Sequence, residues 1–450
     1  MNKKENKISK EIKINKKSAR KNYSNQTGIT LIALVVTIVV LLILAGVSLN
    51  AIFSENGIIK RAQDAQNKMD QAAENDQKGI NELSNWLDSK INGNSGGNTT
   101  GGNTTGGDAN PSTTPKISTL VGTVVDKNTK AEDAYGNKIT IPKGFKVVAH
   151  GTVAGSATYT YSGDNIPAVQ DGIVIENGTD GNQFVWVPVG TIKNKNSSTN
   201  TITLGRYSDF TAIDGKYTPV QKAEDYEAEK PITRTSGSSS WECKELTTFR
   251  AGNTSTGSSA KTATARDLKS FVETTLANGG YYIARFEASG TASKITSKYN
   301  QTVLGNITQP NAAKAAREMY GEIKENNELV YASDLVNSYA WDTAIIFIQT
   351  YSTGTDASTY ASKNKSTSFA KTGINNDKYC NIWDMSGNAC EWTTEYSTHS
   401  VSSIFYPCVK RGGYYYTAGG YASNDASSRN FDRTTYSSSS NGLRPLLYAK

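Results

Sequence analysis

The chain has 450 residues, of which 20% are charged, and a formal net charge of +7 at pH 7. The excess charge is local, because the first 28 residues hold nine Lys or Arg against only Glu5 and Glu11, which leaves the remainder formally neutral. The excess of positive charge therefore lies in one short N-terminal arm and does not indicate a nucleic-acid-binding surface. We expect no nucleic-acid partner.

The run from Ile29 to Leu49 contains no charged residue. As a helix with a rise of 1.5 Å per residue it would be about 31 Å long, which is enough to cross the hydrocarbon core of a bilayer. The basic arm at residues 1–28 precedes it, and positive charge stays on the cytoplasmic side. The pattern predicts a single-pass protein of the cell membrane, with a cytoplasmic N-terminus and an extracellular C-terminal domain.

The border between arm and apolar run reads Gly28-Ile-Thr-Leu-Ile-Ala33-Leu. It resembles the leader of type IV prepilins, which implies cleavage between Gly28 and Ile29 and other pilin-like subunits as partners. That family usually carries Glu at the fifth mature position, where this chain has Ala33. The difference implies a minor or tip component rather than the main filament subunit. A plain membrane anchor without cleavage is the alternative.

Residues 29–91 are expected to form one transmembrane and stalk helix, because Ile59, Ala73, Ile80 and Leu87 fall on one seven-residue series, which Gln66 interrupts. Residues 92–115 consist almost entirely of Gly, Asn, Thr, Ser and Pro. Such a stretch cannot bury apolar area, so it predicts a flexible linker between the stalk and an independent domain.

The remaining sequence is rich in Tyr, Ser, Thr and Gly and predicts an α+β fold. We expect a β-rich lead-in at 116–170 and one large domain at 171–450. Short strand-like runs occur at 139–141, 172–175, 183–189 and 281–287. Helical patterns occur at 265–276, 310–320 and 340–350.

The C-terminal third carries three specific motifs in order. They are Asp384-Met-Ser-Gly-Asn-Ala-Cys-Glu-Trp392, then Arg411-Gly-Gly, and then Arg429 and Arg433 followed by Gly442-Leu-Arg444. This order resembles the formylglycine-generating-enzyme (sulfatase-modifying factor) family over residues 180–450. The resemblance implies an elaborated C-type-lectin-like fold, but a fold alone does not give a function.

Enzymes of that family use two copper-binding cysteines between the last arginine-rich segment and the terminal Gly-Phe-Arg. The stretch from Arg429 to Arg444 has no Cys, and Cu(I) needs soft thiolate ligands. We therefore expect no copper cofactor and no formylglycine generation. The two histidines, His150 and His399, show no metal-ligand spacing. An envelope enzyme of the family with different, non-copper chemistry is the alternative to a non-enzymatic role.

The resemblance also implies a structural Ca²⁺ ion held by Asp384, Gly387, Ala389 and Glu391, since oxygen ligands suit a hard cation. The competing interpretation is that Glu391 caps a turn or pairs with an arginine. Four cysteines in an exported domain allow three disulfide pairings. Because the strands that carry Cys390 and Cys408 are neighbours in the family fold, the resemblance favours a bond between these two.

Residues 412–441 contain no Lys, Glu, Gln, Met, Trp, Leu, Ile or Val. A surface of Tyr, Ser, Gly and Asn has the composition of an antibody paratope. The sequence therefore predicts a surface-displayed, lectin-like domain for ligand binding or adhesion, with an extracellular protein or glycan as ligand. A Ser/Tyr-rich loop set in a Ser/Tyr-rich protein is the alternative. The expected ligand-binding residues are Tyr414, Tyr415, Tyr416, Tyr421, Asn424, Asp425, Asn430, Asp432 and Tyr436.

Overall fold

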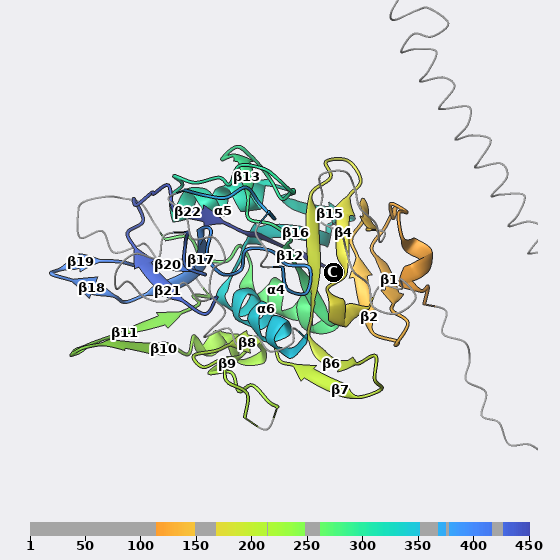
Figure 1. Cartoon of the computed structure of the whole chain (residues 1–450), viewed down its shortest axis with the longest axis horizontal. Coiled ribbons are helices and arrows are strands. Elements are labelled where there is room, and N and C mark those ends of the chain that lie inside the picture. Colours follow the sequence, from red (N-terminus) through yellow and green to blue (C-terminus); the bar gives the residue numbers. More distant parts are fainter. Residues whose placement is uncertain are drawn as a thin grey trace, which may run out of the picture. The chain divides into compact units, whose positions relative to one another are not determined.

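The computed structural model falls into two units, Met1–Asp108 and Ala109–Lys450. It describes residues 114–148, 168–213, 215–247, 262–351, 368–374, 378–415 and 426–450, all of which belong to the second unit (Figure 1). The predicted leader, membrane helix and stalk, together with the cleavage positions Gly28 and Ile29, lie outside these ranges. Within the described part of the chain, no helix is both long and apolar enough to span a bilayer.

A seven-stranded antiparallel sheet forms the centre of the second unit. Its order is β15-β16-β23-β12-β5-β4-β3. The strands are β3 (Phe145–Val147), β4 (Val174–Asn177), β5 (Gln183–Pro188), β12 (Gly280–Ala284), β15 (Glu322–Glu325), β16 (Glu328–Leu335) and β23 (Pro445–Ala449). The C-terminal strand β23 is therefore an inner strand, so the last residues of the chain complete the main sheet.

Both faces of this sheet are buried. Successive side chains of a strand point to opposite faces. Accordingly, Val185 and Val187 of β5 belong to one apolar core, whereas Phe184 and Trp186 belong to another. The run Gln183-Phe-Val-Trp-Val-Pro is apolar on both sides because each side faces a core.

Helices α4 (Leu268–Asn278) and α6 (Ser338–Tyr351) pack on the face that carries Val185 and Val187. Asp267 caps α4 by accepting a hydrogen bond of 2.9 Å from Ser270 N, and Gly279 ends the helix at φ 75° in the left-handed region. Helix α5 (Gln309–Glu318) has Pro310 in its first turn and lies between β16 and the second sheet.

The second sheet has the order β10-β11-β17-β20-β21, and β22 pairs in parallel with β17. Its strands are β10 (Ile232–Ser236), β11 (Ser239–Lys244), β17 (Cys390–Ser397), β20 (Cys408–Arg411), β21 (Arg429–Asp432) and β22 (Asn441–Leu443). This sheet carries all three C-terminal motifs, and β20 and β21 enter and leave the Tyr/Ser-rich segment.

Short hairpins and 3-10 turns complete the unit. The hairpins are β1 (Thr129–Glu132) with β2 (Lys138–Ile141), β6 (Gly190–Lys193) with β7 (Thr199–Ile202), β8 (Gly205–Arg206) with β9 (Gln221–Lys222), β13 (Ser289–Thr291) with β14 (Lys294–Thr296), and β18 (Ser400–Val401) with β19 (Ile404–Phe405). The 3-10 turns are η1 (Ile117–Leu120), η2 (Val169–Asp171) and η3 (Ala223–Ala228).

The expected mixture of helix and strand is confirmed, and the three predicted helices correspond to α4, α5 and α6. The predicted boundary at residue 170 does not separate two cores. Ile117, Ile139 and Phe145 of the lead-in share one apolar cluster with Phe184 and Trp186. The lead-in also supplies β3, so its described residues form part of the main sheet and of the cover over its second face.

Candidate functional site

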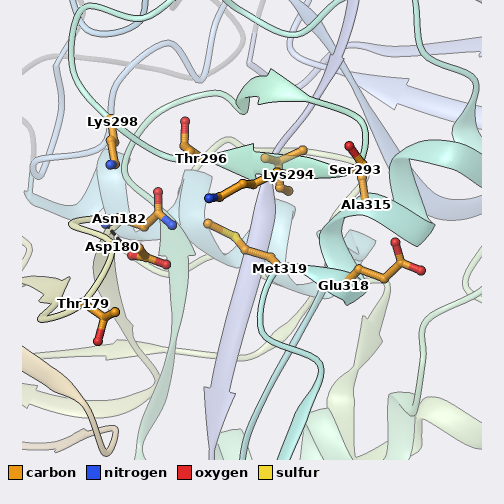
Figure 2. A pocket seen from close by; sticks show the side chains of 11 residues that line it. Thr179, Asp180, Asn182, Ser293, Lys294, Thr296, Lys298, Ala315, Glu318 and Met319 are labelled. Atoms are coloured by element: carbon orange, nitrogen blue, oxygen red, sulfur yellow. Dashed lines mark hydrogen bonds between the residues drawn. The ribbon is translucent and has the colours of Figure 1, made fainter.

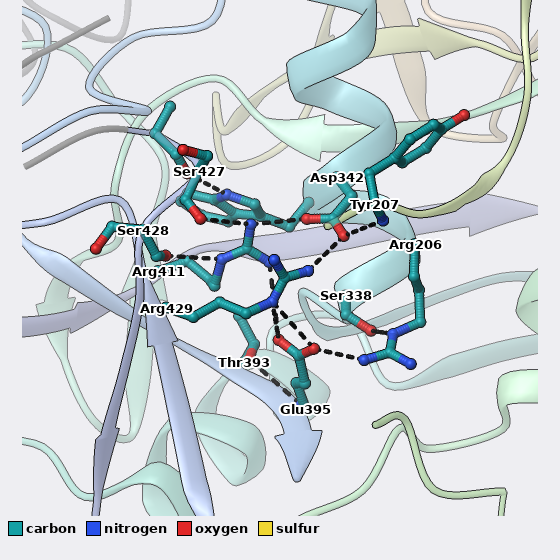
Figure 3. Close-up of polar contacts among 12 residues, drawn as sticks. Arg206, Tyr207, Ser338, Asp342, Thr393, Glu395, Arg411, Ser427, Ser428 and Arg429 are labelled. Carbon is teal, nitrogen blue, oxygen red and sulfur yellow. Dashed lines mark hydrogen bonds and ion pairs between the residues drawn. The ribbon is translucent and has the colours of Figure 1, made fainter. Parts of the chain in front are cut away.

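Five charged side chains with no solvent exposure lie where α6, β8 and the second sheet meet (Figure 3). We call them the charge cluster: Arg206, Asp342, Glu395, Arg411 and Arg429. Asp342 on α6 accepts from Arg411 at 2.7 Å and from Arg429 at 2.6 Å. Buried charges are stable only when they are paired and hydrogen-bonded, and here each carboxylate binds more than one arginine.

Glu395 on β17 is the second anion of the charge cluster. It accepts from Arg206 at 2.6 Å and from Arg429 at 3.1 and 3.2 Å. Burial alone would raise the pKa of Glu395, but the surrounding arginines lower it to about 2. Burial and the adjacent Arg429 lower the pKa of Arg411 to about 10. Glu395 and Arg411 are thus ionised at neutral pH, and the charge cluster joins three segments that are distant in the sequence.

The charge cluster also fixes both ends of the stretch between β20 and β21. Arg411 Nε donates to Ser428 O at 2.9 Å, and Trp341 Nε1 donates to Ala426 O at 2.9 Å. At the other end Arg411 itself precedes Gly412. The chain therefore leaves this buried, hydrogen-bonded frame at Arg411 and rejoins it from Ala426, three residues before Arg429. Residues 416–425, with the predicted binding residues Tyr416, Tyr421, Asn424 and Asp425, lie outside the described ranges.

Two of the predicted binding tyrosines lie directly after β20. Tyr414 and Tyr415 are half-buried, with ring centroids 5.7 Å apart. The ring of Tyr415 packs edge-on against Phe369 at 5.4 Å, and its backbone N–H donates to Asn388 O at 3.1 Å. They form a half-exposed aromatic pair at the start of the predicted binding segment.

The remaining predicted residues Asn430, Asp432 and Tyr436 are also half-buried but lie on a different face. Register pairs Lys410 with Asn430 and Arg411 with Arg429, so alternation places Asn430 and Asp432 opposite the charge cluster. Asp432 accepts from Lys410 Nζ at 2.6 Å. The structure thus separates the predicted set into two groups, and Asp432 already has a cationic partner.

An aromatic group at the β11–β17–β21 end of the second sheet was not predicted. Its members are the half-buried Trp241, His399, Tyr406 and Phe431. The ring centroid of His399 lies 4.5 Å from that of Trp241 and 5.1 Å from that of Phe431. Burial lowers the pKa of His399, so the imidazole is neutral at neutral pH. The sequence signal that could have indicated this group is the presence of single aromatic residues, such as Trp241 and Phe431, within otherwise polar strands.

The predicted calcium ligands occupy a buried acidic region near Arg444. Both oxygens of Glu391 accept from Arg444, at 2.6 and 2.9 Å, as in the alternative of an arginine pair. Asp384 Oδ2 accepts from Gly373 N at 3.1 Å, and Ala389 N donates to Glu287 at 2.8 Å. A carboxylate bound bidentately by a guanidinium does not fit a calcium ligand. Among the described residues, no group of three or more His, Cys, Asp or Glu could hold a metal ion.

The predicted disulfide is not formed. Cys390 and Cys408 lie on adjacent strands, but Cys408 is opposite Tyr396, six residues along β17 from Cys390. Counted along β20, which has no bulge here, the offset is four residues or roughly 13 Å at about 3.3 Å per residue, whereas a disulfide needs Cα atoms within about 7 Å. The thiols of Cys243, Cys390 and Cys408 are free and buried. Burial raises the pKa of Cys243 to about 12 and that of Cys390 to about 11.

A separate pocket of about 460 Å³ lies between the β4–β5 turn, the β13–β14 hairpin and α5 (Figure 2). Lys294 and Lys298 lie on one side of it, and Asp180 and Asn182 on another. Tyr320 donates to Asp180 at 3.1 Å, which holds that carboxylate in place. The pocket is polar and of a size that fits a small hydrophilic molecule.

No protein-family model matches the chain, and no curated protein matches it. Among solved structures, the chain is similar to CarF, with 15% identity and a TM-score of 0.27, over 38% of this chain and 87% of the other. It is also similar to Treponema denticola variable protein 1, with 13% identity and a TM-score of 0.26, over 49% of this chain and 99% of the other. Likenesses of this size do not bear on the proposals below.

Proposed function

We propose that the protein is a membrane-anchored binding protein that displays a lectin-like domain outside the cell and attaches to an extracellular protein or glycan. The residues 412–441 form the binding segment. The N-terminal arm and apolar run act as the anchor, either as a plain signal anchor or, after cleavage between Gly28 and Ile29, as a minor or tip pilin-like subunit. The linker at 92–115 separates anchor from domain.

The observation that supports this proposal most is the way in which the charge cluster holds the binding segment. Binding sites are effective when their residues project from a rigid support. Arg411 and Trp341 donate to backbone oxygens of Ser428 and Ala426, and the arginine is paired with Asp342. The Tyr-rich stretch is thus presented from a frame made of α6, β20 and β21.

A non-enzymatic role is supported by the state of the thiols. Nucleophilic and metal-binding cysteines must reach the thiolate form. Cys243, Cys390 and Cys408 are buried, and burial raises the pKa of each. They are distributed over three strands and not paired at one site.

Replacement of the tyrosines tests the proposal. Tyr414→Ser and Tyr415→Ser, combined with the same change at Tyr416 and Tyr421, should abolish attachment of cells displaying the full chain to protein- or glycan-coated surfaces. Each tyrosine that acts as a binding hot spot should contribute about 2 kcal/mol, or roughly thirty-fold in Kd.

The matched control is Tyr135→Ser, a half-buried tyrosine in the β1–β2 turn, remote in sequence from the binding segment. It should leave attachment unchanged. If the four-tyrosine variant keeps its melting temperature and still attaches, the binding segment is not the site. Turnover of a substrate that one acid or Ser substitution abolishes would favour an envelope enzyme instead.

A further inference from the structure

Three side chains from three strands of the second sheet, β20, β21 and β22, meet on the face opposite the charge cluster. Lys410 Nζ lies 2.6 Å from Asp432 Oδ2 and 3.3 Å from Asn441 Oδ1. The Lys410 and Asp432 side chains are 12% and 15% exposed, and Asn441 is fully buried. A lysine amine, a carboxyl group and a carboxamide are thus held within contact distance and largely out of water.

The surroundings of this group are aromatic. The Lys410 Nζ lies over the ring of Trp392 at 5.6 Å and over that of Tyr436 at 5.2 Å. These rings cover the amine and limit its access to water. Among the described residues, Asn441 Nδ2 is a buried donor without a hydrogen-bond partner. An unsatisfied buried amide is costly, and this NH₂ group belongs to the side chain whose Oδ1 lies beside the Lys410 amine.

We propose that Lys410 and Asn441 become joined by an intramolecular isopeptide bond, with Asp432 as the proton carrier. The neutral Lys410 amine attacks Cγ of Asn441, the Nζ–Cγ bond forms, and the Cγ–Nδ2 bond breaks. Nδ2 leaves as ammonia. The bond order of the carbonyl is restored, no electron is gained or lost, and neither an oxidant nor a cofactor is needed.

The proton balance uses Asp432 alone. The Lys410 ammonium passes one proton to the Asp432 carboxylate, which frees the amine for attack. The carboxyl group then protonates the departing Nδ2 and takes up the second proton that Nζ releases. That last proton goes to solvent, so the overall products are the amide and an ammonium ion. The preassembled contact replaces a bimolecular encounter.

The pKa of Asp432 and that of Lys410 are both raised, and the rise at Asp432 favours the proton transfer whereas the rise at Lys410 opposes it. Burial raises the pKa of Asp432 above its ordinary value, although the Lys410 ammonium acts against this rise. Burial alone would lower the pKa of Lys410, but the neighbouring Cys390 and Asp432 hold it above its usual range. A carboxyl group with a raised pKa is a better proton acceptor from its partner than an exposed one.

The cross-link would join β20 to β22 and close a covalent loop over residues 410–441. This loop contains the whole Tyr/Ser-rich binding segment. A cross-link of this kind reduces the freedom of the unfolded chain and keeps the segment attached to its frame under load. The inference stands on Lys410, Asp432 and Asn441 and does not depend on what the segment binds.

Peptide mapping of the full chain tests the proposal. In a digest of the denatured protein, the peptide that carries Lys410 and the peptide that carries Asn441 should appear as one branched species, lighter than their sum by one molecule of ammonia. Lys410→Met and Asp432→Asn should each return the two separate peptides with unmodified masses. The matched control is Lys195→Met, which removes a lysine paired with Asp171 at 2.6 Å and should leave the branched species unchanged.

Asn441 is followed by Gly442, so a succinimide at this position would also lose ammonia. That product is a single unbranched peptide and persists in Lys410→Met. Such persistence, or separate unmodified peptides from folded wild-type protein, would overturn the proposal. Circular dichroism of the Asp432→Asn variant distinguishes a lost proton carrier from a lost fold, because a folded variant without the bond supports the role of Asp432.

Discussion

At the scale of single residues, Asp342 joins more segments than its sequence context suggests. It accepts from Arg411, from Arg429 and from the backbone N–H of Tyr207 at 2.8 Å. The sequence indicated Arg411 and Arg429 through the resemblance to a known motif order. It gave no sign of Asp342 or Arg206, because a charged residue inside a helix or a short strand is normally exposed and only the tertiary fold buries it.

Asp342→Asn should destabilise the domain strongly. The change keeps the shape of the side chain but removes its negative charge. Arg411 and Arg429 then lose a charged partner in a site that is buried from solvent. Breaking a buried pair by removing one partner costs about 3–5 kcal/mol. Denaturant unfolding of the full chain measures this loss.

The control for this change is Glu273→Gln. Glu273 forms an exposed i,i+4 pair with Lys269 on α4 at 3.8 Å, and such pairs contribute about 0–0.5 kcal/mol. A loss in Asp342→Asn no larger than that of the control would contradict the structural role of the charge cluster.

At the scale of elements, the end of β11 is tied to α6 and β17 through one buried acid. Glu245 accepts from Ser338 N at 3.0 Å and Ser338 Oγ at 2.6 Å, and also from the Thr394 hydroxyl. Burial raises the pKa of Glu245 to about 7, although these hydrogen bonds oppose the rise. The junction of three elements therefore favours a protonated carboxyl group.

Glu245 should make the stability of the domain fall as the pH rises. Its folded-state pKa is about 7 against an ordinary value of 4.5, so its contribution is complete below about pH 4.5 and is lost as the pH rises through about 7. The loss is on the order of 1.4 kcal/mol per unit of pKa shift.

Denaturant unfolding of wild type and Glu245→Gln between about pH 5 and about pH 8 measures this effect. Glu391 has its pKa raised to about 7 in the same range, so only the difference between the two proteins isolates Glu245. Identical pH slopes for the two proteins would contradict the prediction.

The sequence patterns were sufficient to predict the three helices and some of the strands. The helical patterns at 265–276, 310–320 and 340–350 correspond to α4, α5 and α6, and the apolar run at 183–189 corresponds to β5. Strand register was not predictable from these signals. Because Trp392 pairs with Lys410, Cys408 lies well beyond the position opposite Cys390, and a bulge between Trp392 and Tyr396 increases the offset. Neighbouring strands do not imply neighbouring residues.

At the scale of the whole molecule, the lead-in expected at 116–170 and the large domain expected at 171–450 share one apolar cluster. The low-complexity stretch 92–115 spans the division between the two units at Asp108 and Ala109. The position expected as a boundary, residue 170, does not divide this cluster, because apolar side chains from both sides of it pack together. The apolar residues of the lead-in cover a face of the main sheet that would otherwise be exposed. The sequence of a strand that is buried on both faces does not indicate which segment of the chain covers either face.

Limited proteolysis should therefore release one resistant fragment. Cleavage within 92–115 should leave a C-terminal unit with the melting temperature of the domain in the full chain. A chain that begins at residue 109 should fold and bind as the full chain does. A chain that begins at 171 lacks the Ile117, Ile139 and Phe145 side chains, each of which contributes roughly 2 kcal/mol, and should show no cooperative melting. If the chains that begin at 109 and at 171 have the same melting temperature, residue 170 is a domain boundary after all.

The contacts that hold the ends of the binding segment have one more consequence. Arg411 and Trp341 donate hydrogen bonds to the backbone carbonyl oxygens of Ser427, Ser428 and Ala426. Every amino acid has such an oxygen. These hydrogen bonds therefore do not depend on which side chains stand between Gly413 and Ala426. Randomised codons between Gly413 and Ala426 should yield libraries in which most clones fold, so that selection acts on recognition alone and the domain can be given new specificities without redesign of its core.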